Sequence, residues 1–272
     1  MRIIFLNCWN SRTGKVFLDF VEGYSLNIDI FCFQEVSPKL FEKISNLLPD
    51  HTGYYLTENK MIDLGFVTGQ ATFVNKNIKV ISSGKIGLYR QVYNSIQEHS
   101  AVYCGDELNA DMSSSSGGKP RSLEREGCHN DVWYMQYADI EISNKVVHLA
   151  NIHGKARPGH KLDTPTRLRQ SKVIINFFKD KHGPKIIGGD FNLLPETKSV
   201  QMFEEAGYKN LIKDYKIKTT RNMLAWGTLK KSEEKQYFAD YVFTSFDVKV
   251  KNFEVHDIEI SDHLPLILSF EI

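Results

Sequence analysis

The sequence predicts a mixed α/β fold in which helices cover β-sheets. Runs of β-branched and aromatic residues, typical of strands, recur along the chain and alternate with segments of helical periodicity. Residues 132–142 and 146–152 form two such runs, separated only by a short Ser-Asn-Lys connection that indicates a hairpin. The last strand-like runs also follow one another with little helix between them. We therefore expect part of the sheet to be antiparallel.

The individual elements follow from the spacing of apolar residues. The runs expected to be strands are residues 3–6, 28–33, 71–74, 78–81, 132–142, 146–152, 186–188, 238–244, 248–255 and 264–270. Apolar residues at helical spacing predict helices within residues 16–24, 40–48, 168–178 and 200–206. In the first helix, for example, Val16, Phe20 and Tyr24 fall on one face.

Composition and charge exclude several classes of protein. With 272 residues, 42% of them hydrophobic, the chain is too apolar to be disordered and long enough to bury a core. A net charge of +1 gives no global attraction to nucleic acid or an anionic membrane, so any affinity for phosphate must be local. Residues 64–75 are the longest stretch without Asp, Glu, Lys or Arg, well short of the roughly 20 residues that span a bilayer. The amino-terminal apolar run is too short for a secretory signal, so we expect a cytoplasmic monomer without a membrane span.

The only clear shift in composition lies at residues 105–130. This segment is rich in serine and glycine and lacks apolar periodicity, which predicts a surface-loop insertion within a single domain spanning residues 1–272. A domain boundary is the alternative. Cys104 lies just before the segment and Cys128 near its end. They could pair, or could hold zinc with two nearby histidines, although the C-x₂-C spacing of structural zinc sites is missing.

Acidic, amide and imidazole side chains gather where the expected strands begin or end. In α/β folds these are the places where loops present catalytic groups. The set is Asn7, Gln34, Glu35, Asn151, His153, Asp190, Asn192, Asp240, Ser261, Asp262 and His263. Any one of them, such as Asp190, is more readily explained as a turn or cap residue. Their recurrence at successive strand ends favours one shared functional site.

The chemistry of that site follows from its carboxylates. Glu35, Asp190 and Asp262 lie directly beside apolar runs, where a carboxylate needs a cation, hydrogen bonds or a shifted pKa. Converging carboxylates repel one another unless a divalent ion compensates, and carboxylate and amide oxygens suit Mg²⁺ or Mn²⁺ better than zinc. Since Mg²⁺ leaves positions open for water and substrate phosphate, the expected substrate is a phosphate ester.

The ordered motifs resemble those of the endonuclease/exonuclease/phosphatase superfamily, which includes deoxyribonuclease I, exonuclease III, abasic-site endonucleases, neutral sphingomyelinases and inositol polyphosphate 5-phosphatases. The motifs are IFLNCW (4–9), CFQEV (32–36), NIH (151–153), GGDFN (188–192), DYVF (240–243) and SDHLPL (261–266). Each is weak alone, but together they are in register over nearly the whole chain. The resemblance implies a four-layer α/β sandwich, in which two packed mixed β-sheets are flanked by helices.

The resemblance also implies roles for single residues. Glu35 would be the principal Mg²⁺ ligand, with Asn7 and Asp262 beside the metal. Asp190 would orient and deprotonate the attacking water, and Asn192 would donate to a phosphate oxygen.

A histidine pair completes the implied machinery. Asp240 would hold His263, which donates to the phosphoryl oxygen; an imidazole held by a carboxylate has a defined tautomer and a raised pKa. His153 would be a second phosphate-side histidine, as in the deoxyribonuclease I and sphingomyelinase branches. In deoxyribonuclease I a glutamate backs that histidine, and residues 65–72 of this chain contain no acid. We therefore expect His153 to bind phosphate rather than to act as a general acid.

Basic residues are concentrated next to this machinery. Residues 153–185 contain nine Lys or Arg against two Asp, a local net charge of +7. Lys155, Arg157 and Lys161 lie on a loop that leaves the active-site strand, so we expect them to contact substrate phosphates. A solvated basic face is the alternative. Arg167 is expected to pair within the fold, and Trp226 either stacks on a base or sugar or packs in the core.

These observations favour a Mg²⁺-dependent phosphodiesterase, a nuclease acting on nucleic acid by in-line attack of water. The alternative is a phosphatase or phospholipase acting on a small phosphoester, such as an inositol phosphate or a sphingomyelin-like lipid. A non-catalytic phosphate-binding protein is a third class, disfavoured because no expected catalytic position is replaced.

Overall fold

The computed structural model describes residues 1–61, 66–93, 101–102, 130–227 and 234–272. Nearly all of the expected loop at residues 105–130, together with Cys104 and Cys128, lies outside the described residues. No helix in the described part of the chain is long and apolar enough to cross a membrane.

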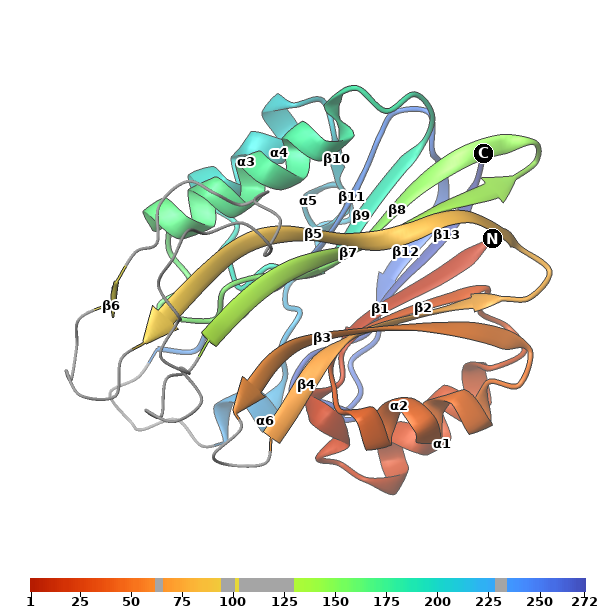
Figure 1. The fold of residues 1–272 in the computed structure, drawn as a ribbon, viewed down its shortest axis with the longest axis horizontal. Coiled ribbons are helices and arrows are strands. Elements are labelled where there is room, and N and C mark those ends of the chain that lie inside the picture. Colours follow the sequence, from red (N-terminus) through yellow and green to blue (C-terminus); the bar gives the residue numbers. More distant parts are fainter. Residues whose placement is uncertain (62–65, 94–100, 103–129, 228–233) are drawn as a thin grey trace, which may run out of the picture.

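Two mixed sheets of six strands each pack face to face (Figure 1). Sheet I contains, in order, β10 (Lys209–Asn210), β11 (Asp240–Thr244), β9 (Lys185–Asp190), β8 (Lys145–His153), β7 (Asn130–Ile142) and β5 (Lys79–Tyr93), with the short β6 (Ala101–Val102) on β5. Sheet II contains β3 (His51–Met61), β4 (Phe66–Asn75), β2 (Ile30–Val36), β1 (Arg2–Asn7), β13 (Leu266–Glu271) and β12 (Lys249–Val255). The β8–β9 and β1–β2 pairs are parallel, and β3 meets β7 through Asn59 and Asp131.

Helices form the two outer layers (Figure 1). Helices α3 (Pro165–Lys179) and α4 (Lys198–Glu205) cover sheet I, and α1 (Lys15–Tyr24) and α2 (Pro38–Leu47) cover sheet II. The short α5 (Leu211–Asp214), α6 (Met223–Trp226) and 3₁₀ helix η1 (Trp9–Ser11) lie in connections. The predicted four-layer sandwich is confirmed.

Local sequence sets where the longer helices begin. The Ser37 side chain accepts a hydrogen bond from the Leu40 amide at the start of α2, and Thr164 accepts from the Arg167 amide at the start of α3. Proline follows each cap residue, where its fixed φ suits the first helical turn. Both helices therefore begin where the sequence provides a cap.

Strand β1 shows why the strands read as continuous apolar runs. Ile3 and Phe5 belong to the core that also contains residues of sheet I, whereas Ile4 and Leu6 pack in the core beneath α1 and α2. Successive side chains of a strand point to opposite faces, and here both faces are covered. The layers thus bury two cores, one that extends from between the sheets to helices α3 and α4 and one under the helices of sheet II.

The structure corrects two expectations about the strands. Strand β3 was not expected, because His51–Met61 mixes polar residues with few apolar ones, and β5 continues to Tyr93 instead of ending at residue 81. The expected antiparallel pairing among the last strands is confirmed, since β11 pairs antiparallel with β9 of sheet I and β12 with β13 of sheet II. The predicted hairpin is confirmed, with a turn at Ser143 and Asn144, whose φ angles are 52° and 61°.

Candidate active site

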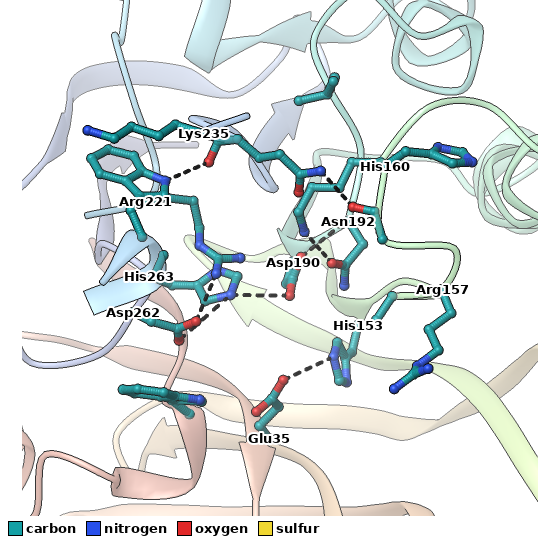
Figure 2. Close-up of a pocket in the computed structure, with 18 of the residues that line it drawn as sticks. Glu35, His153, Arg157, His160, Asp190, Asn192, Arg221, Lys235, Asp262 and His263 are labelled. Carbon is teal, nitrogen blue, oxygen red and sulfur yellow. Dashed lines mark hydrogen bonds and ion pairs between the residues drawn. The ribbon is translucent and has the colours of Figure 1, made fainter. Parts of the chain in front are cut away.

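The expected site residues meet where the two sheets end together. Sheet I contributes His153 at the end of β8, Asp190 at the end of β9 and Asp240 at the start of β11. Sheet II contributes Asn7 at the end of β1 and Glu35 near the end of β2. The loop before β13 adds Asp262 and His263. A cleft of about 1180 Å³ opens over this junction (Figure 2).

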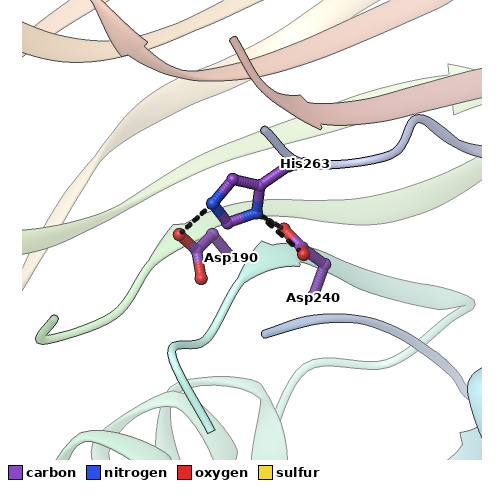
Figure 3. Close-up of side chains that lie close together, drawn as sticks. All are labelled: Asp190, Asp240 and His263. Carbon is purple, nitrogen blue, oxygen red and sulfur yellow. Dashed lines mark hydrogen bonds and ion pairs between the residues drawn. The ribbon is translucent and has the colours of Figure 1, made fainter. Parts of the chain in front are cut away.

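A buried histidine is held between two carboxylates (Figure 3). His263 Nδ1 lies 2.9 Å from both carboxylate oxygens of Asp240, and its Nε2 lies 3.7 Å from Asp190 Oδ2. Strand pairing creates this arrangement, because Asp240 of β11 is directly opposite Asp190 of β9. Asp240 therefore fixes the imidazole with Nε2 facing Asp190.

Charge and burial shift the pKa values of this cluster in opposite directions. Burial and Arg221 lower the pKa of His263, but Asp240 and Asp190 raise it more, so the net shift is upward. Burial raises the pKa of Asp190, but His263, Lys161 and His153 outweigh it, and the net shift is well below the usual range. Asp190 is consequently ionised beside a histidine that favours its protonated form.

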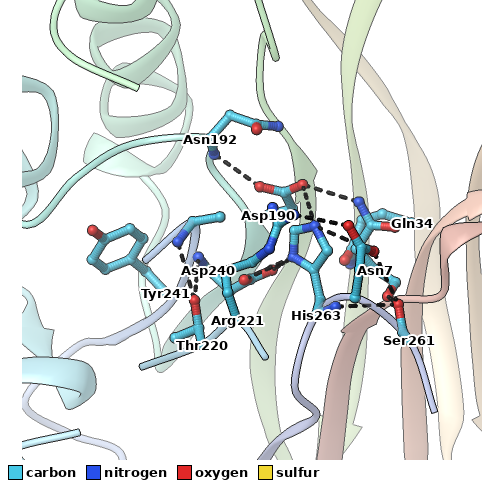
Figure 4. Close-up of polar contacts among 12 residues, drawn as sticks. Asn7, Gln34, Asp190, Asn192, Thr220, Arg221, Asp240, Tyr241, Ser261 and His263 are labelled. Atoms are coloured by element: carbon cyan, nitrogen blue, oxygen red, sulfur yellow. Dashed lines mark hydrogen bonds and ion pairs between the residues drawn. The ribbon is translucent and has the colours of Figure 1, made fainter. Parts of the chain in front are cut away.

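Asn7 links the two sheets within the site (Figure 4). Its Nδ2 donates to Glu35 Oε1 at 3.1 Å and to Asp190 Oδ2 at 3.0 Å, and its Oδ1 accepts from the Trp9 amide. Glu35 itself has φ of 57° and sits at an irregularity in the β2–β4 pairing. Its side chain remains 34% exposed, and its Oε1 lies 3.9 Å from His153 Nε2. This bulge turns a carboxylate into the cleft from a strand that is otherwise buried.

Asp262 has a cationic partner that the sequence did not predict. Arg221 Nη2 donates to Asp262 Oδ2 at 2.8 Å, and both side chains are largely buried. The backbone of Arg221 also forms a β-bridge with His263, which places the guanidinium over the site. Arg221 lies in a connection without periodicity, 41 residues before Asp262, so no sequence pattern pointed to it.

Two of the three basic residues expected to contact substrate on the loop after β8 are buried. Lys161 is 6% exposed and its Nζ donates to Asn192 Oδ1 at 2.5 Å, while burial lowers its pKa. Lys155 is 9% exposed, with its Nζ 5.5 Å from the ring centre of Trp133. Only Arg157, of the three predicted basic residues, is an exposed side chain lining the cleft.

Both the oxygen and the nitrogen of the Asn192 side-chain amide form hydrogen bonds. Its Oδ1 accepts from Lys161, and its Nδ2 donates to the Gly154 carbonyl at 3.2 Å. Its backbone amide donates to Asp190 Oδ1 at 2.9 Å. Asn192 therefore ties Lys161 and the loop after β8 to the Asp190 carboxylate.

Arg167 has the structural role expected of it. It is 1% exposed and donates to the carbonyl oxygens of Lys155, Ala156, Pro158 and Leu162. These are backbone groups of the loop after β8, so a single buried guanidinium fixes the path of that loop.

Trp226 lies in α6 and lines the cleft, with Lys235 over its ring. Its Nε1 donates to the Gln236 carbonyl at 3.3 Å, and the Asn222 side chain at the start of α6 donates to the Ser261 carbonyl at 2.7 Å. It belongs to neither hydrophobic core. Trp9, Arg12 and Lys235 also line the cleft and were not predicted.

The four-layer sandwich, with carboxylates and an aspartate-held histidine at one end of both sheets, is a phosphoesterase fold. The chain belongs to the Endonuclease/Exonuclease/phosphatase family, whose family model matches residues 5–263. Members of this family are phosphoester hydrolases and generally use a divalent metal ion.

Solved structures agree on the fold. An endonuclease/exonuclease/phosphatase from Bacteroides vulgatus is 17% identical with a TM-score of 0.69, over 100% of this chain and 98% of that one. TDP2 of D. rerio, complexed with a single-strand DNA product, is 13% identical with a TM-score of 0.70, over 100% and 99%. A mannosyl-6-phosphatase of Bacteroides thetaiotaomicron is 15% identical with a TM-score of 0.65, over the whole of both chains. No significant match was found among curated protein sequences.

Proposed function

We propose that this protein is a Mg²⁺-dependent phosphodiesterase that hydrolyses nucleic acid. The observation that carries the proposal is the arrangement of Asp190, His263 and Asp240, in which an ionised carboxylate faces an imidazole held by a second carboxylate. A base and a hydrogen-bond donor thereby face the same point of the cleft.

The residues around Glu35 fit a hard divalent ion. Glu35, Asp190, Asp240 and Asp262 bring four carboxylates to one end of the cleft, and Arg221 already neutralises Asp262. Glu35 is the partly exposed carboxylate of this group, and its contacts are with the Asn7 amide and His153. Glu35 would hold the ion with Asn7 beside it. When bound, Mg²⁺ would supply a Lewis acid that polarises a phosphoryl oxygen.

The chain's own residues account for the remaining chemistry. Asp190 accepts a hydrogen bond from the attacking water and takes its proton as the new bond to phosphorus forms. The ester P–O bond opposite the water breaks, and the leaving oxygen takes a proton from solvent water. His263 donates through Nε2 to a phosphoryl oxygen, where negative charge builds up. Lys161 and Arg221 add positive charge on the side of Asn192 and Asp262.

A nucleic-acid substrate is supported by the composition of the cleft wall. Besides Lys161 and Arg221, the basic residues Arg12, Arg157 and Lys235 line it, and so do tryptophans. Cations along a groove neutralise successive phosphates, and aromatic rings stack on bases. A second candidate is a small phosphoester, favoured by one observation: Lys155 and Lys161 are buried, so of the three basic residues expected to contact substrate on the loop after β8 only Arg157 is exposed to a polymer.

Labelled single-stranded, duplex and abasic oligonucleotides, assayed beside inositol phosphates and sphingomyelin, test the proposal. We expect cleavage of an oligonucleotide with Mg²⁺ and none with EDTA. Glu35→Ala and Asp190→Asn should abolish turnover. Asp190→Asn should also lower stability, because His263, Lys161 and His153 hold the pKa of Asp190 well below its usual range and so favour its charge in the folded protein. Glu42→Gln, on the exposed surface of α2, is the matched control. Turnover of only the small phosphoesters, or retained activity in either variant, would contradict the proposal.

A further inference from the structure

All three tryptophans of the chain line the active-site cleft, and a basic side chain lies over each of their rings. The Arg12 guanidinium carbon lies 5.0 Å from the ring centre of Trp9, Lys155 Nζ lies 5.5 Å from that of Trp133, and Lys235 Nζ lies 5.2 Å from that of Trp226. The chain therefore places every indole it has in one cleft, each beside a cation.

Two of the three pairs are accessible and one is not. Trp133 is 6% exposed and belongs to the core that contains residues of both sheets and of α3 and α4, and its partner Lys155 is also buried. Trp9 and Trp226 are only partly buried, and their partners Arg12 and Lys235 are exposed. We call Trp9 and Trp226 the two platforms. Trp133 instead is part of the fixed floor of the cleft.

A nucleobase of the substrate can displace the cation that lies over each platform and stack on the indole ring in its place. An exposed cation–π contact is weak, whereas a nucleobase stacked on an aromatic side chain binds more strongly. A base that displaces Arg12 or Lys235 leaves a flexible cation next to the phosphate that the base carries. The same two side chains can thus recognise both parts of a nucleotide.

The platforms lie on different sides of the reacting centre. The Trp9 amide donates to Asn7 Oδ1 at 3.0 Å, and Asn7 bonds Glu35, so this platform is tied to the Glu35 side. Trp226 donates to the Gln236 carbonyl and lies under Lys235. Figure 2 shows Lys235 and Glu35 on opposite sides of Asp190 and His263.

We infer that Trp9 and Trp226 stack on bases on both sides of the scissile phosphate, so that the substrate is an unpaired strand cut at an internal phosphodiester. This inference rests on the proposed function. Bases in a duplex are already stacked on their neighbours and cannot also lie on two indoles that flank one phosphate. An inositol phosphate offers no planar ring, and a terminal phosphate offers a base on one side only.

Intrinsic tryptophan fluorescence tests the inference directly, because every indole lines the cleft. The Asp190→Asn protein, in EDTA, is titrated with a single strand of ten thymidines, with its duplex and with inorganic phosphate. We expect the single strand to quench emission and to bind more tightly than the duplex. Trp9→Leu and Trp226→Leu should each weaken binding by about 5- to 150-fold. Trp133→Phe should leave the affinity unchanged.

Variants of the two cations keep the test valid if a tryptophan variant does not fold. Arg12→Gln and Lys235→Gln change exposed side chains, and each should reduce the slope of log affinity against log salt by about 0.7 for the single strand. Unchanged slopes, or unchanged affinity in the Trp9→Leu and Trp226→Leu proteins, would overturn the inference. Weaker binding in only one of the two tryptophan variants would also overturn it, because a single stacked base indicates cleavage at a terminal phosphate.

A separate measurement distinguishes this failure from failure of the proposed function. Methyl p-nitrophenyl phosphate is a diester with a single ring and no base. If the unmodified enzyme hydrolyses it with Mg²⁺ while the platform variants bind the single strand normally, the hydrolase stands and the platform inference is wrong. If the unmodified enzyme hydrolyses neither this diester nor an oligonucleotide, the proposed function itself is wrong.

Discussion

Asp240 presents both carboxylate oxygens to His263 Nδ1 at the same distance, 2.9 Å, so the two residues act as one unit. We expect Asp240→Asn and His263→Ala each to lower kcat by about 10²- to 10⁴-fold, and the double variant to lose little more than either. Steady-state kinetics of the three variants, with circular dichroism to check folding, measure this. Losses that multiply in the double variant would show that the residues act separately.

The raised pKa of His263 predicts an alkaline limit to activity. Because donation through Nε2 needs the protonated imidazole, kcat should fall as pH rises through the His263 pKa, which lies above the ordinary value of 6.5. The same shift stabilises the fold fully below pH 6.5, and this contribution is lost as pH rises through the folded-state pKa. Asp240→Asn removes a charge that raises this pKa, so the alkaline limb should move to lower pH. A limb that does not move would exclude His263 as the titrating group.

Arg221 is expected to bind the phosphate while restraining Asp262. Arg221→Met should lower kcat/KM by about 100-fold, because a charged donor at the reacting centre is lost. The same change removes the arginine that pairs with Asp262, so calorimetric titration should show tighter Mg²⁺ binding. Arg221→Lys keeps the charge without the planar fork and should recover only part of the activity. Arg2→Met, at a surface ion pair with Glu254, serves as the control. Weaker Mg²⁺ binding in Arg221→Met would contradict this assignment.

Arg157 and Lys161 should behave differently even though they share one loop. Arg157→Ala should reduce the salt slope of oligonucleotide binding by about 0.7 to 0.9 and leave turnover of methyl p-nitrophenyl phosphate unchanged. Lys161→Ala should lower turnover of both substrates, because Lys161 bonds Asn192 and Asn192 bonds Asp190. Salt titrations of oligonucleotide binding, together with steady-state kinetics on both substrates, test the two expectations. Equal effects of the two variants would mean that the whole loop serves the catalytic centre.

Arg167 is expected to matter for stability. Arg167→Met leaves backbone carbonyls of the loop after β8 without their buried donor, and we expect a loss of about 2 to 4 kcal/mol in the free energy of unfolding. Urea denaturation measures it. Lys172→Met, an exposed change on the same helix, should have little effect. Equal stability of the two variants would rule out the structural role.

Much of the site could be predicted because its residues are tied to strands. Glu35 and Asp190 each follow an apolar run, and an apolar run marks a buried strand whose end projects into a cleft. The same reasoning missed β3, because residues 51–61 contain few apolar residues to mark a strand. It also missed Arg221, whose position depends on a backbone bridge to His263 that no local pattern encodes.

A cluster of basic residues in a sequence indicates affinity for phosphate, but it does not indicate where each side chain points. Lys155 and Lys161 were expected to face the substrate, and the structure turns them toward Trp133 and Asn192 instead. The ring face of Trp133 and the amide oxygen of Asn192 offer partners inside the fold that compete with solvent. The partner that a lysine side chain contacts depends on tertiary structure, which the local net charge of the sequence does not describe. Of the three basic residues expected to face the substrate, only Arg157 is exposed in the cleft.

The hydrogen bond between Asn7 and Asp190 joins residues 183 positions apart, one in each sheet. Contacts of such long sequence separation form slowly, because the chain entropy between them must be lost before they stabilise anything. During refolding, strand pairing within each sheet can form without this contact, whereas hydrolysis needs both sheets docked. The time course of regained activity therefore reports the closure of the sandwich, and far-ultraviolet circular dichroism reports the sheets themselves.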